Sequence, residues 1–84
     1  MIRRADVLWR AIPGFLVLGT VDGALVEVDG PGAEIWELLG DPTTVDGIAV
    51  VLADRYAAPP ARVRDDVAHV VDQLVAAGFV DVDG

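Results

Sequence analysis

Serine, cysteine and lysine, which supply many of the reactive groups of enzymes, are absent from this chain, and His69 is its only histidine. Without thiolates and with a single imidazole, the usual zinc sites cannot be assembled, and the serine and cysteine nucleophiles of hydrolases are missing. The glycines of DGPG (29–32) have neither the spacing nor the lysine of a phosphate-binding loop. These residues predict a protein that is not an enzyme and that binds no metal and no cofactor.

Asp65 and Asp66 are the one pair of adjacent acidic residues. Both fall in a predicted helix, where successive side chains point about 100° apart. The two carboxylates therefore diverge, whereas a catalytic pair has to face a common substrate. They are better suited to stabilising the start of the helix or to attracting a basic partner. His69 falls on the back of the same helix, where we expect it to be exposed to solvent.

The elements that would position any site must fit into one small domain. The 84 residues predict a single domain spanning 1–84. Fourteen acidic residues against six arginines give a net charge of −8, which repels nucleic-acid phosphates and anionic membranes and favours basic partners. The lack of cysteine fits a reducing compartment, and neither a signal peptide nor an apolar run of about 18 residues is present. We therefore expect a cytoplasmic protein that binds neither nucleic acid nor membrane.

Three short apolar segments predict an antiparallel sheet. Residues 6–12, 15–20 and 24–28 are rich in Val, Leu and aromatic residues, and turn signals at 13–14 and 21–23 separate them. In the third segment Ala24, Val26 and Val28 share one face, which we expect to be the buried one.

The rest of the chain predicts three helices and a last extended segment at 79–82. The first helix begins at Pro31, the second at Thr43 or Thr44, and the third after Pro59-Pro60. The expected fold class is α+β, with a three-stranded antiparallel sheet followed by three helices.

The third helix has an apolar surface that is wider than docking to a core requires. Val67 belongs to the docking stripe, and Ala68, Val71 and Val75 extend the apolar surface round one flank, together with Arg64. One interpretation is that the extra valines pack inside the domain. The other is that they line a groove between this helix and a sheet edge, open to a partner.

The order and spacing of several short motifs resemble the PqqD-like family, the recognition elements for precursors of ribosomally made, modified peptides. The motifs run from about Asp6 to Val82 and comprise Val28-Asp29, Gly32, Ile35-Trp36, Leu38-Leu39, Thr44-Val45, Tyr56, Asp66-Val67, Leu74 and Gly78-Phe79-Val80. The resemblance implies a winged helix-turn-helix-like fold. It also implies that the leader region of a precursor peptide adds as a strand to the third strand and lies between that strand and the third helix.

Carried over by position, the resemblance implies peptide-binding residues in both elements. They are Leu25, Val26, Glu27, Val28 and Asp29 in the strand, and Arg64, Val67, Ala68, Val71 and Val75 in the helix. The implied function is that of a non-catalytic adaptor, which binds the leader and delivers the precursor to a processing enzyme. The motifs favour the leader peptidase of a lasso peptide pathway as that enzyme.

Two other functions fit parts of the pattern. A PqqD-type chaperone that presents a peptide to a radical SAM enzyme would share the same motifs. A winged-helix DNA-binding regulator would share the fold, but Asp65, Asp66 and Asp72 in the third helix oppose contact with phosphates. We expect a monomer, with the unprotected strand edge as a possible site of pairing with a second copy.

Overall fold

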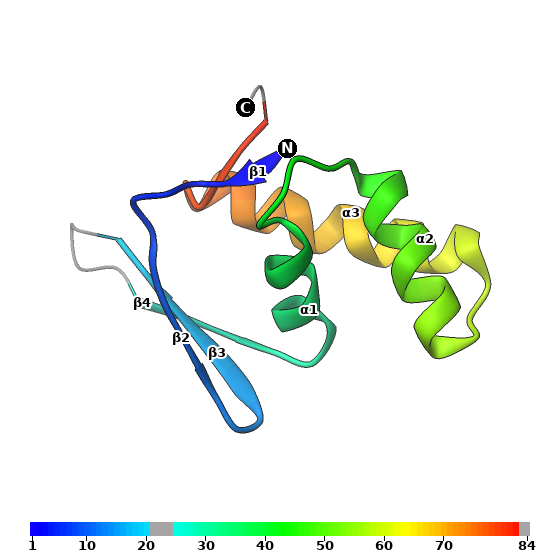
Figure 1. Cartoon of the computed structure of the whole chain (residues 1–84), viewed down its shortest axis with the longest axis horizontal. Coiled ribbons are helices and arrows are strands. Elements are labelled where there is room, and N and C mark those ends of the chain that lie inside the picture. Colours follow the sequence, from blue (N-terminus) through cyan, green and yellow to red (C-terminus); the bar gives the residue numbers. More distant parts are fainter. Residues whose placement is uncertain (21–24, 83–84) are drawn as a thin grey trace.

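A computed structural model of the chain describes residues 1–20 and 25–82. Its elements, in chain order, are β1 (Ile2–Arg3), β2 (Leu8–Ile12), β3 (Phe15–Gly19), β4 (Leu25–Asp29), α1 (Pro31–Leu38), α2 (Val45–Tyr56), α3 (Pro60–Ala76) and β5 (Val80–Asp81). The sheet of β2, β3 and β4 extends to one side of the helices, and β1 and β5 pair near the two ends of the chain (Figure 1). The expected α+β class is confirmed. The turn predicted at 21–23, and Ala24, lie outside the described residues.

β3 is the central strand of the sheet and pairs antiparallel with β2 on one side and β4 on the other. Residues directly opposite each other point to the same face. The register therefore places on the inner face, toward the helices, Trp9, Ala11, Leu16, Leu18, Val26 and Val28. Val28 packs against the core, as predicted, whereas Val26 is 37% exposed at the edge of the sheet.

The joint between β4 and α1 depends on three residues of DGPG. Gly30 has a φ of 55°, a left-handed conformation that glycine adopts without steric cost. Pro31 occupies the first turn of α1, where its fixed φ suits the helix and its missing N–H has no helical partner to lose. A Cβ on Gly32 would lie 2.3 Å from Val28 Cγ1. The strand and the helix therefore approach each other so closely that only a glycine fits at position 32.

The three helices enclose the core together with the inner face of the sheet. α2 begins after Thr44, whose side chain accepts a hydrogen bond from the Gly47 N–H at 3.0 Å, so the predicted start is confirmed. α2 and α3 pack side by side, and the side chains buried deepest among these elements are Leu18, Ile35, Trp36, Leu39, Ile48, Val67 and Phe79. None of the described helices has the length and apolar character needed to cross a membrane.

β1 joins the N-terminal residues to the rest of the domain, although the sequence did not predict this strand. It pairs antiparallel with β5, and the Arg3 N–H donates to the Leu39 carbonyl at 2.9 Å. The Arg3 guanidinium lies 4.9 Å from the ring centre of Trp9 and 5.6 Å from that of Trp36, within the range of cation–π attraction. Arg3 thereby connects β1, β2 and α1.

Candidate functional site: the groove between β4 and α3

One edge of β4 is open. β4 pairs with β3 alone, and among the described residues no other backbone segment hydrogen-bonds to it. The peptide groups along such an edge alternate in direction, so every second residue presents its N–H and C=O outward. An extended chain can add to this edge as a fourth strand.

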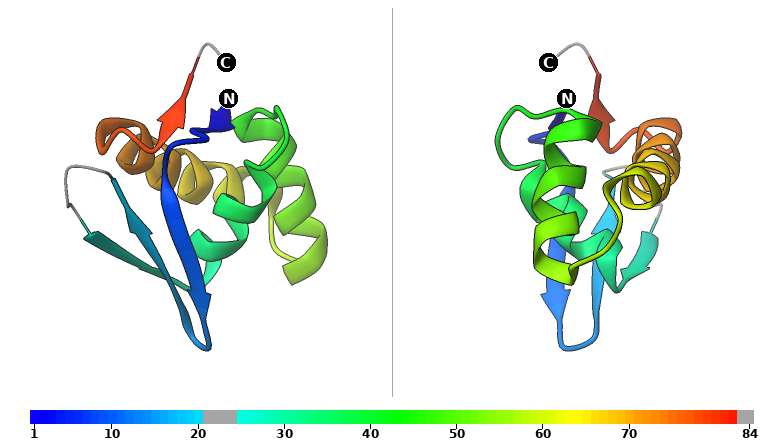
Figure 2. Two further views of the ribbon diagram at one scale, coloured as in Figure 1. Left: turned by 60° about the vertical axis from the view of Figure 1, so that its left-hand side comes forward. Right: turned by 90° about the vertical axis from the view of Figure 1, so that its right-hand side faces the viewer.

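α3 forms a second wall beside the open edge, and together they enclose a groove of about 410 Å³. In the right-hand view of Figure 2, β4 and α3 lie on the same side of the molecule and α2 on the other. The strand and the joint that follows it contribute Val26, Glu27, Val28, Asp29, Pro31 and Gly32. The second wall is made of Asp66, Val70, Gln73, Leu74, Ala77 and Phe79.

The groove has an apolar floor and an acidic rim. Leu74 and Phe79 are buried beneath it and Val70 is half-buried, so a bound chain would find apolar surface between the walls. Asp66 is exposed on its helical wall, Glu27 and Asp29 are exposed at its strand edge with side chains on the outer face, and no arginine is among its lining residues. The electrostatics of the groove therefore favour a cationic ligand over an anionic one.

A smaller apolar pocket of about 220 Å³ adjoins the groove. The two share Pro31, Asp66 and Val70, so Asp66 stands at their junction. The pocket is lined further by Ile35, Leu52, Tyr56, Ala58, Val63 and Val67. The Glu34 carboxylate accepts a hydrogen bond from Tyr56 and thereby raises the pKa of that phenol above its ordinary value. Tyr56 is thus a neutral side chain at the mouth of an apolar pocket.

The flank of α3 that faces β4 is not the flank that carries the extra valines. Arg64 forms an ion pair with Asp46 of α2. Val71, which lies two turns after Arg64 on the same side of α3, is only 3% exposed. Val75 packs against the core and Ala68 is half-buried. Arg64 therefore lies on the side of α3 that faces α2, and the burial of Val71 and Val75 favours the interpretation in which the extra valines pack inside the domain.

The structure brings together only part of the predicted peptide-binding set. Val26, Glu27, Val28 and Asp29 border the groove, but the register turns the side chains of Leu25, Glu27 and Asp29 to the outer face of the sheet. Val67 is buried under the smaller pocket. The lining of neither space includes Arg64, Ala68, Val71 or Val75.

Sequence reasoning missed the residues that form the helical wall. Asp66, Val70, Gln73, Leu74 and Ala77 form this flank of α3, and none of them is among the predicted peptide-binding residues. The signal was the mixed character of that flank, where apolar and polar residues alternate at helical spacing. Such a pattern is typical of a surface that is half covered by other elements.

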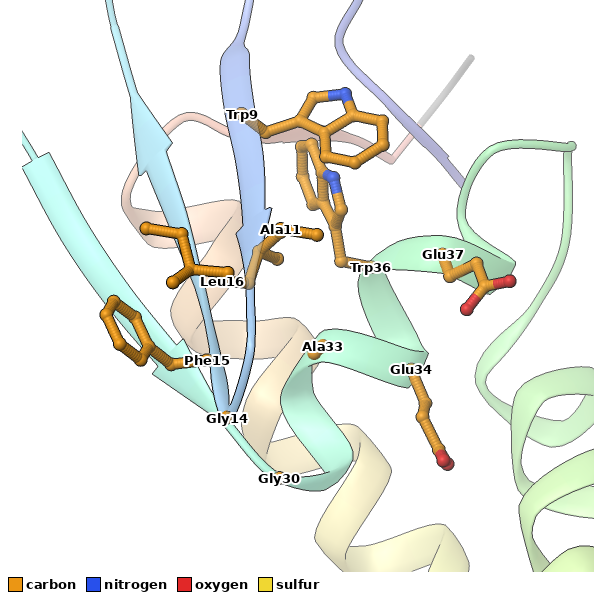
Figure 3. A pocket seen from close by; sticks show the side chains of 11 residues that line it. Trp9, Ala11, Gly14, Phe15, Leu16, Gly30, Ala33, Glu34, Trp36 and Glu37 are labelled. Atoms are coloured by element: carbon orange, nitrogen blue, oxygen red, sulfur yellow. The ribbon is translucent and has the colours of Figure 1, made fainter.

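A separate hollow of about 530 Å³ lies between α1 and the hairpin of β2 and β3. Figure 3 shows Trp36 rising from α1 to meet Trp9 of β2 inside it, with Phe15 pointing away from α1. Trp9 is 48% exposed, whereas Trp36 is buried and its Nε1 has no hydrogen-bond partner in the described part of the chain. We call this hollow the Trp9 pocket. It borders β2, at the opposite edge of the sheet from the groove.

The family model for PqqD, coenzyme PQQ synthesis protein D, matches residues 14–80. The chain belongs to the PqqD family. The match starts at the β2–β3 turn and ends in β5, so both walls of the groove are elements of this PqqD-family domain. A comparison with curated proteins found no match.

Among solved structures, the chain is similar to TbiB1 in complex with the TbiA(beta) leader peptide. The TM-score is 0.86 at 20% sequence identity, with 98% of this chain and 96% of that chain covered. At this identity the likeness establishes a shared fold, and it extends over the whole domain, including β4 and α3.

Proposed function

We propose that this protein is a non-catalytic adaptor that binds the leader region of a ribosomally synthesised precursor peptide by strand addition to β4. The observation that carries the proposal is the open edge of β4 beside the groove formed with α3. Membership of the PqqD family supports it. So does the shared fold with TbiB1, a protein that has been solved with a leader peptide bound.

The geometry suits a peptide with a particular pattern. Backbone hydrogen bonds to β4 would provide affinity that is independent of sequence, and alternate side chains would point into the groove between Val28 and Leu74. The smaller pocket would take one apolar or aromatic side chain next to the strand. A basic residue at the junction would meet Asp66. The preferred leader is therefore an extended segment with apolar side chains at every second position and a nearby Lys or Arg.

The proposed contacts modify the set implied by the resemblance. The backbone of Leu25–Asp29 would receive the added strand, and the helical wall would consist of Asp66, Val70, Gln73, Leu74 and Ala77. Val67 would contribute as the floor of the smaller pocket. Arg64, Ala68, Val71 and Val75 would act indirectly, by fixing α3 against α2.

Delivery to a processing enzyme forms the second half of the proposal. A leader held on β4 leaves the Trp9 pocket free at the other edge of the sheet, so an enzyme could contact that pocket while the peptide stays bound. Holding peptide and enzyme together raises the effective concentration of the substrate. We propose the leader peptidase of a lasso peptide pathway as this enzyme, acting in the cytoplasm.

Calorimetric titration with the leader of the precursor encoded beside this protein tests the binding step. We expect saturable binding with a dissociation constant of about 1 μM or below, near −8 kcal/mol or stronger. A DNA duplex at the same ionic strength is the control and should give no heat of binding. No peptide binding combined with salt-sensitive DNA binding would replace the adaptor with a DNA-binding regulator.

Trp9→Ala tests the delivery step. The variant should bind the leader as well as the wild type does, because Trp9 does not line the groove, but it should stimulate leader cleavage by the peptidase less. Stimulation of a radical SAM enzyme in place of the peptidase would assign the protein to the chaperone type. Unchanged stimulation by the variant would exclude the Trp9 pocket as the contact.

A further inference from the structure

The outer face of the sheet, which turns away from the helices, is unusually apolar for an uncovered surface. The register places three rows on this face, and each row runs across the sheet with one residue from each strand. Leu8 and Leu25 stand at the two sides of the first row and are 68% and 76% exposed. Ile12, Phe15 and Asp29 form the third row, and Val17 occupies the centre of the face. Large exposed apolar groups gathered on one sheet face mark an interaction surface.

The face is hollowed, and it lies on the side of the sheet opposite the leader groove, although Glu27 and Asp29 border both. A depression of about 200 Å³ lies between Leu8, Arg10, Val17 and Leu25, because Gly19 between the two leucines has no side chain to fill the row. The proposed leader adds to the edge of β4 and lies against the inner face and α3. The outer face would therefore stay uncovered with a leader in place.

The middle row consists of Arg10, Val17 and Glu27, and its two charges indicate which partner this face can bind. Arg10 on β2 and Glu27 on β4 flank Val17 from opposite sides, and neither forms an ion pair with another described residue. A two-fold axis along the strands, between two stacked copies, sets β2 of each copy over β4 of the other. Arg10 then meets Glu27 twice, Leu8 meets Leu25 twice, and Ile12 lies over Asp29 at the far end. An axis across the strands would instead stack Arg10 on Arg10 and Glu27 on Glu27.

We propose that the outer face of the sheet binds a second copy of this chain, with the two-fold axis parallel to the strands. Self-complementarity of one patch is what a two-fold dimer requires, and two sheets stacked nearly aligned are a common packing arrangement. Three strands of five residues give a face of roughly 17 by 14 Å, which is smaller than the interfaces of stable complexes. The dimer is accordingly weak, forms at high protein concentration and is separate from leader binding.

Sedimentation equilibrium tests the dimer, over about 10 μM to about 1 mM protein and at physiological ionic strength so that the −8 charges of the two copies are screened. The wild type should shift from monomer to dimer within this range. Arg10→Glu and Glu27→Arg should each weaken association at least about tenfold, the effect of losing a charge pair and placing like charges together. The double variant should restore association to within a few fold of the wild type.

The matched control combines Glu27→Arg with Arg62→Glu, an exposed arginine on α3. This pair has the same net charge as the restoring pair but lies off the face, so association should stay weak. Circular dichroism checks that each variant is folded, and Leu25→Asp gives a second way to break the face. A wild type that is monomeric throughout overturns the proposal. So does a dimer that both charge reversals leave unchanged but that Val26→Pro abolishes, which would indicate edge pairing through β4.

Discussion

At the scale of single residues, Gly32 is where β4, the strand proposed to bind the leader, is attached to the core. The position has no room for a side chain, because a Cβ would lie 2.3 Å from Val28 Cγ1. Gly32→Ala should therefore lower the free energy of unfolding by about 1–3 kcal/mol, as overpacking does elsewhere. It should also weaken leader binding, since Val28 is both in the groove and in the contact. Urea unfolding and peptide titration measure the two effects.

Val28→Ala provides the control for this prediction, because it removes the methyl group that a new Cβ would strike. The added cost of Gly32→Ala should be much smaller in the Val28→Ala background than in the wild type. Such a difference is the coupling expected of two residues in direct contact. Equal costs in both backgrounds would show that the glycine is needed for another reason.

Tyr56 gives a second prediction at this scale, because it is the only tyrosine of the chain and its phenolate absorbance reports on one site. The hydrogen bond to the Glu34 carboxylate raises the pKa of Tyr56, so folding favours the protonated phenol. The resulting stabilisation is present at neutral pH and is lost as the pH rises through the pKa of Tyr56. Glu34→Ala should bring this pKa back toward its ordinary value. A titration curve that is identical in the variant would rule out Glu34 as the cause.

At the scale of elements, three consecutive residues of α3 point in directions that the structure distinguishes. His69 is exposed on the back, Val70 lines the groove, and Val71 is buried against the core. His69→Asp should change neither stability nor leader affinity. Val70→Asp should leave the domain folded and weaken leader binding at least about tenfold, since it puts a charge at an apolar contact. Val71→Asp should unfold the domain, because it buries an unpaired carboxylate.

This series needs only circular dichroism and calorimetry. It also tests the expectation from the sequence that Val71 lines the groove. If Val71→Asp stayed folded and lost leader binding while Val70→Asp bound normally, the groove would have to be moved to the flank that faces α2.

How much the sequence predicted can be judged from α3. Its extent was clear, because Pro59-Pro60 precedes it and apolar residues recur at helical spacing. The joint at DGPG and the cap at Thr44 were also predictable, because local chemistry determines them. The orientation of α3 about its own axis was not, since it depends on which element covers which flank. The Arg64 side of α3 faces Asp46 of α2, and such long-range packing leaves no local trace. β1 was missed because a strand of two residues shows no periodicity, and its pairing with β5 is also long-range.

At the scale of the whole molecule, β1 pairs with β5 and so joins the N-terminal and C-terminal parts of the domain beside the groove. Arg3 donates to Leu39, Arg4 donates its N–H to the Phe79 carbonyl at 2.9 Å, and the Met1 carbonyl accepts from Thr43 at 2.9 Å. Phe79 also lines the groove, so the position of its backbone bears on leader binding. Deleting residues 1–4 removes these bonds together with the Arg3 cation that lies against Trp9 and Trp36.

We expect this deletion to lower the free energy of unfolding by roughly 3 kcal/mol, at about 1 kcal/mol for each of these backbone hydrogen bonds, and to weaken leader binding as β5 loosens. Arg3→Ala should account for part of the loss, because the Arg3 side chain also donates to the Trp36 carbonyl at 3.3 Å. Arg4→Ala is the matched control, since its side chain pairs with Asp6 on the exposed surface and such pairs contribute little. Urea unfolding of the three variants decides the matter. If Arg4→Ala cost as much as Arg3→Ala, charge rather than closure by β1 would be what stabilises this end of the domain.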